Sequence, residues 1–164
     1  MEKITPHLWF DTEAKEAGTF YTSLFVGSRV KNTTTLHDTP SGSVDIVTIE
    51  LAGQELTLLS AGPLFKFTPA ISFLVSCTNI EEVDRLWSGL SQGGSVLMEL
   101  GSYPFSERYG WTQDRYGLSW QVCPTGMGEL LNDPDPARGQ RAMKAMLGMK
   151  KIDVAALRAA ADAA

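Results

Sequence analysis

The order of predicted secondary-structure elements occurs twice along this chain, and this repeat limits the possible folds more than any other sequence feature. In the first copy, an apolar strand at residues 4–10 leads into a helix that begins near Ala14 and ends before Gly27. Apolar side chains at three- and four-residue spacing indicate the helix, and Asp11 and Thr12 supply its expected N-cap. Three strands are predicted next, at residues 29–36, 44–51 and 55–60.

The second copy begins with an apolar strand at residues 70–75. Its helix can be capped by Thr78 or Asn79 and is ended by Gly93 and Gly94. Strands are predicted at residues 95–100, 109–113 and 118–123, with a polar loop at 101–107. Identity between the copies is low, so the repeat depends on element order and on a shift of 66 residues that aligns the two helices.

The repeat predicts a single α+β domain over residues 1–164, built from two strand-helix-three-strand (βαβββ) modules. Module one covers residues 1–62 and module two covers residues 68–124. Residues 125–164 belong to neither copy and are expected to form a helical tail. A stripe of Met143, Met146 and Leu147 is typical of a packing surface, so we expect the tail to dock on the domain or on a partner subunit.

Charge and composition narrow the classes of partner. The formal net charge is −5, and Lys and Arg are scattered along the chain, which argues against nucleic acid. The chain opens without a basic and then apolar run, and no stretch approaches the ~18 apolar residues of a membrane span, so we expect a cytoplasmic protein. Cys77 and Cys123 are widely spaced and are expected to be reduced structural thiols, which the fold can bring close together.

Several sequence strings, taken in order, resemble one protein family. They lie at residues 4–11, 20–25, 62–67, 70–73, 81–87, 110–111, 114–121 and 142–153. Together they are similar to the PhnB-like branch of the glyoxalase/bleomycin-resistance/dioxygenase (vicinal oxygen chelate) superfamily. PhnB-like proteins are often called 3-demethylubiquinone-9 3-methyltransferase domain proteins.

The resemblance implies that each module forms a curled mixed sheet and that the two sheets together line a cup. Members of the superfamily usually pair as homodimers and hold small molecules in the cup. In the catalytic relatives, a divalent metal is bound by side chains from the first and last strands of each module.

The positions expected to hold that metal are poor in donors. His7 lies near the ligand position of the first strand, but residues 56–60 offer no carboxylate, and residues 69–72 hold no histidine. On the last strand the glutamate position aligns with Gln121, whose amide is a weak ligand. We therefore predict no metal and no other cofactor; His7 can be a structural strand histidine and Gln121 a buried amide with satisfied hydrogen bonds.

The methyltransferase in the family's name would need a nucleotide-type cofactor held by a glycine-rich loop between a strand and a helix, and the sequence offers none. We expect instead an aromatic cup for a small organic molecule, with catalytic residues unassigned. The predicted ligand-binding residues are His7, Trp9, Ser60, Trp111 and Gln121. Residues 101–108 can either close over the mouth of the cup or form a solvated hairpin connection.

Two other functions stay open. One is a divalent-metal lyase, isomerase or dioxygenase of the same superfamily, with His7 and further ligands that the alignment does not locate. The other is a purely structural or interaction role for the Met-rich tail. The sequence does not name the ligand, because specificity depends on pocket shape.

Overall fold

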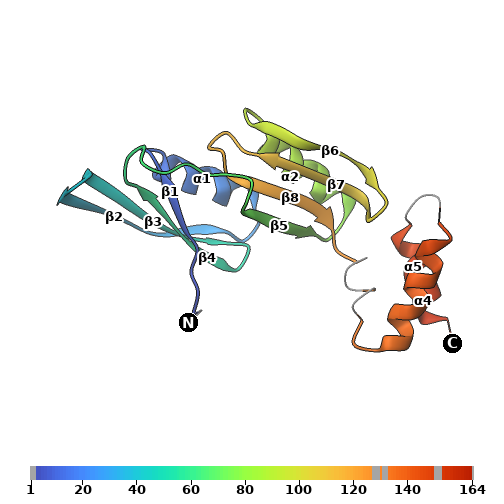
Figure 1. The fold of residues 1–164 in the computed structure, drawn as a ribbon. Coiled ribbons are helices and arrows are strands. Elements are labelled where there is room, and N and C mark those ends of the chain that lie inside the picture. The colour runs from blue at the N-terminus through green and yellow to red at the C-terminus, as the bar shows by residue number, and fades with distance from the viewer. Residues whose placement is uncertain (1–2, 127–129, 131–132, 150–152, 164) are drawn as a thin grey trace. The chain divides into compact units, whose positions relative to one another are not determined.

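The computed structural model describes residues 3–126, 130, 133–149 and 153–163. The chain divides into two compact units, residues 1–70 with 116–118 and residues 71–115 with 119–164. Each unit carries one four-stranded sheet and one helix that packs against it (Figure 1). The predicted α+β fold with two βαβββ modules and a helical tail is confirmed.

Module one follows the predicted element order. It consists of β1 (His7–Phe10), α1 (Ala14–Leu24), β2 (Arg29–Thr39), β3 (Gly42–Leu51) and β4 (Gln54–Ser60). The spatial order of the strands is β1-β4-β3-β2. Because β1 pairs with β4 in parallel and the other pairs are antiparallel, the sheet is mixed, as expected.

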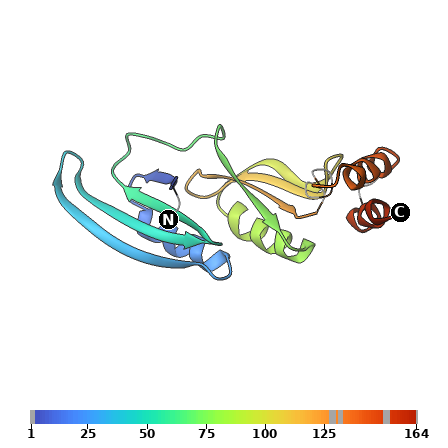
Figure 2. The ribbon, with the colours of Figure 1, turned by 90° about the horizontal axis from the view of Figure 1, so that it is seen from below.

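The core of module one lies between α1 and the sheet (Figure 2). Ala14, Ala17, Gly18 and Tyr21 are the buried positions of α1, at the three- and four-residue spacing of one helix face. Gly18 brings the helix close to β3, because a Cβ atom placed there would lie 3.2 Å from Val47 Cγ1.

Module two repeats the arrangement. It consists of β5 (Ser72–Cys77), α2 (Ile80–Ser91), β6 (Ser95–Tyr103), β7 (Ser106–Gln113) and β8 (Ser119–Pro124), in the spatial order β5-β8-β7-β6. Val83, Leu86 and Leu90 of α2 are fully buried. The Trp87 ring lies over Gly110 of β7, where an added Cβ atom would come within 2.4 Å of the ring.

The predicted loop at residues 101–107 is wrong. Strands β6 and β7 continue through most of this region, and Gly101 pairs with Tyr109 while Tyr103 pairs with Ser106. The ring of Phe105 stacks on Tyr103 at 5.5 Å and meets Tyr109 edge-on at 5.0 Å. These ring contacts hold the segment as a β-hairpin, and its closure over the mouth of the cup stays a prediction.

The helices of the two modules begin in different ways. Asn79 caps α2 as predicted, and its side chain accepts a hydrogen bond from the Glu82 backbone N–H at 2.8 Å. The predicted cap of α1 is wrong, because the N-cap residue is Glu13 and it makes no capping side-chain bond. Instead, the Ala14 backbone N–H donates to Ser60 Oγ of strand β4 at 2.9 Å.

The tail contains helices α4 (Pro136–Leu147) and α5 (Val154–Asp162). They pack on each other around the buried side chains of Leu130, Ala142, Leu157 and Ala161. Asp153 caps α5, as predicted from the sequence. Met143 and Leu147 remain exposed, so docking of the Met-rich stripe on a partner subunit stays a prediction.

The two cysteines lie on neighbouring strands, because Ser76 of β5 pairs with Cys123 of β8 and Cys77 pairs with Pro124. Successive side chains of a strand point to opposite faces, so the two thiols are on opposite faces of the sheet. Both cysteines are free. Burial raises the pKa of the Cys77 thiol to about 12. Among the described helices, none has both the length and the apolar character that crossing a membrane requires.

Candidate functional site

Each sheet has one face covered by its helix and one face turned away from it, which we call the open face. On β1, Leu8 and Phe10 are buried, whereas His7 and Trp9 alternate with them and lie on the open face of module one. His7 is exposed. Trp9 is half-buried, and its indole N–H donates to the Gly62 carbonyl at 2.8 Å.

Ser60 is on the other side of the sheet. Its register partner on β1 is Phe10, which faces α1, and its own hydroxyl accepts the bond from Ala14 at the start of that helix. The expectation that Ser60 points to the same side as His7 and Trp9 is therefore wrong. The strand alternation was predicted correctly, but the register of β4 against β1 was not known from the sequence.

In module two, Trp111 and Gln121 are direct register partners on β7 and β8, so their side chains share a face. They lie on the open face, because the intervening positions Thr112, Trp120 and Val122 are buried. The Trp111 indole N–H donates to Ser119 Oγ at 2.7 Å on the same face.

A chain of hydrogen bonds fixes the Gln121 amide. The Tyr109 hydroxyl donates to Gln121 Oε1 at 2.7 Å, and Gln121 Nε2 donates to Ser72 Oγ at 2.6 Å. Burial raises the pKa of the Tyr109 hydroxyl above its usual value, so this group stays protonated as a donor. The interpretation of Gln121 as an amide with satisfied hydrogen bonds is confirmed.

Tyr109, Ser72 and Ser119 were not among the predicted site residues. Tyr109 stands two residues before Trp111, and this spacing on a strand places both on one face. That signal was available in the sequence. The serines could not be found in the same way, because their relation to Gln121 and Trp111 depends on the pairing of distant strands.

The donor sets of the open faces do not fit a catalytic divalent metal. In module one, Glu55 is two positions before Thr57 on β4, but its carboxylate is paired with Lys31 at 2.5 Å, leaving His7 beside hydroxyl and apolar groups. In module two the donors beside Gln121 are its amide, the hydroxyls of Tyr109 and Ser72, and the thiol of Cys123, which is two positions further along β8. Within residues 3–126, 130, 133–149 and 153–163, no group of three or more His, Cys, Asp or Glu side chains is placed to hold an ion.

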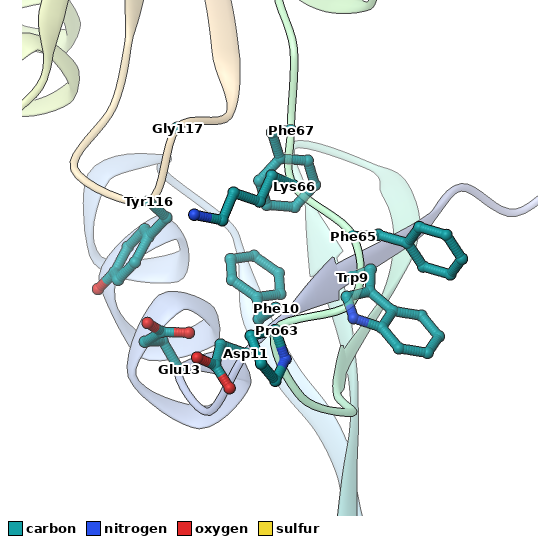
Figure 3. A pocket seen from close by; sticks show the side chains of 10 residues that line it. All are labelled: Trp9, Phe10, Asp11, Glu13, Pro63, Phe65, Lys66, Phe67, Tyr116 and Gly117. Carbon is teal, nitrogen blue, oxygen red and sulfur yellow. The ribbon is translucent and has the colours of Figure 1, made fainter. Parts of the chain in front are cut away.

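The first unit also contains a pocket of about 360 Å³ (Figure 3). It is lined by Trp9, Phe10, Asp11, Glu13, Pro63, Phe65, Lys66, Phe67, Tyr116 and Gly117. Phe10 meets Phe67 edge-on at 5.1 Å and Tyr116 at 5.8 Å, which makes one wall aromatic. Figure 3 shows the charged ends of Asp11, Glu13 and Lys66 on the side of the pocket where Tyr116 lies, away from Trp9 and Phe65.

Comparison with solved structures shows which proteins share this fold. The chain is similar to a protein from Pseudomonas aeruginosa, with 23% identity, a TM-score of 0.65 and coverage of 76% of this chain and 98% of that chain. It is also similar in fold to the fosfomycin resistance protein FosX from Listeria monocytogenes, with 15% identity, a TM-score of 0.53 and coverage of 75% and 94%. These likenesses, both below 25% identity, show that the fold of two βαβββ modules is shared with those proteins.

The family is shown by sequence. The pattern of the family described as 3-demethylubiquinone-9 3-methyltransferase matches residues 2–123. The PhnB protein from Bacillus cereus is 40% identical, with a TM-score of 0.70, over 76% of this chain and 100% of that chain. The chain therefore belongs to this PhnB-like family, as its sequence strings indicated. A search of curated proteins gave no match.

Proposed function

We propose that this protein binds small organic molecules on the open face of each module, without a catalytic metal, and that it does so as a cytoplasmic homodimer. The proposed ligand contacts are His7, Trp9, Trp111 and Gln121. The observation that carries the proposal is the open face of module two, where a glutamine held by two hydrogen bonds stands among aromatic side chains.

This arrangement supports binding more than metal chemistry. An amide held between Tyr109 and Ser72 has a fixed orientation and can offer a further lone pair or N–H to a ligand. Trp111 adds a large apolar surface whose N–H is already bonded to Ser119. Rigid aromatic area with a few oriented polar groups is the usual composition of a small-molecule site.

The methyltransferase activity in the family's name finds no comparable support. A nucleotide-type cofactor is usually held at the carboxyl edge of a parallel sheet, where a glycine-rich turn opens a helix. Here each sheet has one parallel pair only, and α1 follows β1 through residues 11–13, which contain no glycine.

The proposed dimer has support from exposed apolar side chains on edge strands. Leu74 of β5 is 59% exposed on the open face, and Leu36 of β2 is 45% exposed. Burial of such side chains against a second copy would favour association at about 25 cal/mol per Å² of apolar surface, before the costs of association. Sedimentation or light scattering measures the mass directly, and a monomer at micromolar concentration would contradict the dimer.

Metal content tests the central claim. Protein purified without chelator should contain less than about 0.1 equivalent of any divalent metal, and addition of Ni²⁺, Zn²⁺ or Fe²⁺ should leave the melting temperature unchanged. A stoichiometric ion that stabilises the fold would favour a metal-dependent lyase, isomerase or dioxygenase instead.

Ligand binding is tested with a matched pair of glutamine variants. Small molecules that quench tryptophan fluorescence are selected by screening, and their affinities are then measured for Gln121→Ala and Gln92→Ala. Gln121 is fixed on the open face, whereas Gln92 is exposed at the end of α2. We expect roughly tenfold weaker binding for Gln121→Ala and no change for Gln92→Ala, because one lost hydrogen bond to an oriented amide contributes about 1.4 kcal/mol. Equal affinities in the two variants would argue against this site.

A further inference from the structure

The pocket of the first unit has a chemical character different from that of the open faces. Its lining residues come from residues 1–70 and 116–118, so it is complete within one compact unit. Of the four proposed ligand contacts on the open faces, Trp9 is the one that also lines this pocket. The remaining walls combine four aromatic rings with two carboxylates and one ammonium group.

The aromatic part is built around Phe10 at the end of β1. Phe10 is 3% exposed and is contacted edge-on by Phe67, which belongs to the segment after β4, and by Tyr116. The position of Tyr116 is fixed further by a hydrogen bond from its hydroxyl to Glu16 Oε1 at 2.7 Å. The pocket wall is therefore held by contacts within the protein and does not depend on a ligand to form.

The polar part carries a net negative charge. Asp11 and Glu13 follow β1 directly and contribute two carboxylates, against the single ammonium of Lys66. In the described part of the chain, neither carboxylate forms an ion pair, although Glu13 Oε2 accepts a hydrogen bond from the Thr12 backbone N–H. A cation in the pocket would gain attraction without first breaking an existing salt bridge.

We propose that this pocket binds a small organic cation, an ammonium group attached to one aromatic ring or an apolar group of similar size. The ammonium would face Asp11 and Glu13, and the apolar part would pack against Phe10, Phe67 and Tyr116. Cations are attracted both by carboxylates and by aromatic ring faces within ~6 Å. The volume of about 360 Å³ is near the lower end of small-molecule sites, which fits a ligand of this size.

The charge requirement is tested with three probes of the same shape: benzylamine, which is protonated at pH 7, benzyl alcohol and phenylacetate. Calorimetric titration of the full-length protein should give affinity for benzylamine at least tenfold higher than for benzyl alcohol, with phenylacetate weakest. The benzylamine affinity should fall at high salt, because the carboxylates are near the surface. Benzyl alcohol binding as tightly as benzylamine, tighter binding of phenylacetate, or no detectable benzylamine binding would each overturn the proposal.

The position of the bound cation is tested with variants that remove either a carboxylate or the ammonium group of the pocket, which should change the affinity in opposite directions. Asp11→Asn and Glu13→Gln should each weaken benzylamine binding roughly two- to fivefold, as expected for a partly exposed ion pair. Lys66→Gln should strengthen it by a similar factor, a gain that misfolding does not imitate. Glu81→Gln is the matched control, since Glu81 is an exposed carboxylate in the first turn of α2. An equal loss in Glu81→Gln, or weaker binding in Lys66→Gln, would contradict the assignment.

The cation pocket and the ligand site on the open faces can be tested independently of each other. Gln121→Ala should leave benzylamine binding unchanged, because Gln121 does not line this pocket. Conversely, Asp11→Asn should leave the affinity of ligands found for the open face unchanged. A loss in both assays from the same variant would mean that the pocket and the open face act as one site, and this outcome would overturn the inference of a separate cation pocket.

Discussion

The two modules have the same element order and sheet topology, but different residues make the close contact between helix and sheet and cap the helix. In module one the helix approaches its sheet through Gly18 on the helix, whereas in module two the close approach is made by Gly110 on the sheet, under Trp87. The first turn of α1 is completed by Ser60 from a distant strand, and that of α2 by its own Asn79. Topology can therefore be retained in two copies while the individual contacts diverge.

The difference between the two glycines gives the largest expected effect. Gly110→Ala should destabilise the protein by about 3 kcal/mol, because its Cβ atom would lie 2.4 Å from the Trp87 ring. The β7 backbone and the ring on α2 are both packed, so neither can move away freely. Gly18→Ala should change stability by less than about 1 kcal/mol, because the 3.2 Å contact with Val47 is offset by better helix propensity.

Urea unfolding of both variants measures this contrast. The double variant Gly110→Ala, Trp87→Leu is the control, since removal of the ring should recover part of the loss caused by the added methyl group. If Gly110→Ala were as stable as the wild type, the close approach in module two would be refuted.

The two capping arrangements give a smaller effect. Ser60→Ala leaves the buried Ala14 N–H without its acceptor and should cost about 2 kcal/mol, whereas Asn79→Ala should cost about 1 kcal/mol at a more exposed helix end. Chemical denaturation gives both values. Hydrogen exchange should show fraying confined to the first turn of α2 in Asn79→Ala, and equal protection of both helices in both variants would argue against this assignment.

A pH-dependent effect is expected to be the smallest. Hydrogen bonds from the Thr78 backbone N–H and hydroxyl lower the pKa of Glu82 below its usual value. A carboxyl whose pKa is lower in the folded state stabilises the fold above its unfolded pKa, and this contribution is lost as the pH falls through the folded pKa. Glu82→Gln should therefore cost about 0.5 kcal/mol at pH 7, and the difference from wild type should shrink below about pH 4.

Thermal melts of wild type and Glu82→Gln at pH 7, 5 and 3 check this prediction. Glu81→Gln provides the comparison, because Glu81 stands beside Glu82 in the same helical turn without the Thr78 hydrogen bonds. A difference between wild type and Glu82→Gln that stayed constant down to pH 3 would contradict the role of the carboxylate.

The fold could be predicted from local patterns, since helical spacing and strand alternation are present in each segment by itself. The N-cap of α1 could not, because the acceptor Ser60 is 46 residues from Ala14. The continuation of β6 and β7 through residues 101–107 was missed for a related reason: this segment is polar and contains glycine, and ring contacts among Tyr103, Phe105 and Tyr109 support it. Local sequence gives the type of an element more reliably than its partners.

The site shows the same limit. Alternation placed His7 with Trp9 on a common face, but it did not say which face the helix covers. The face on which Ser60 lies depends on the register of β4 against β1. This register places Ser60 on the face covered by α1, away from the other predicted residues. The amide network of Gln121 likewise needs three strands to be paired before its members meet.

Because Cys77 is buried, the rate at which its thiol is labelled measures how often module two opens. A sulfhydryl that is 0% exposed and has a pKa of about 12 reacts with alkylating reagents only when the surrounding structure opens. Cys123, on the other face of the same sheet, is half-buried and is expected to react sooner. The ratio of the two labelling rates would then report how often the interior of this half of the molecule is exposed to reagent.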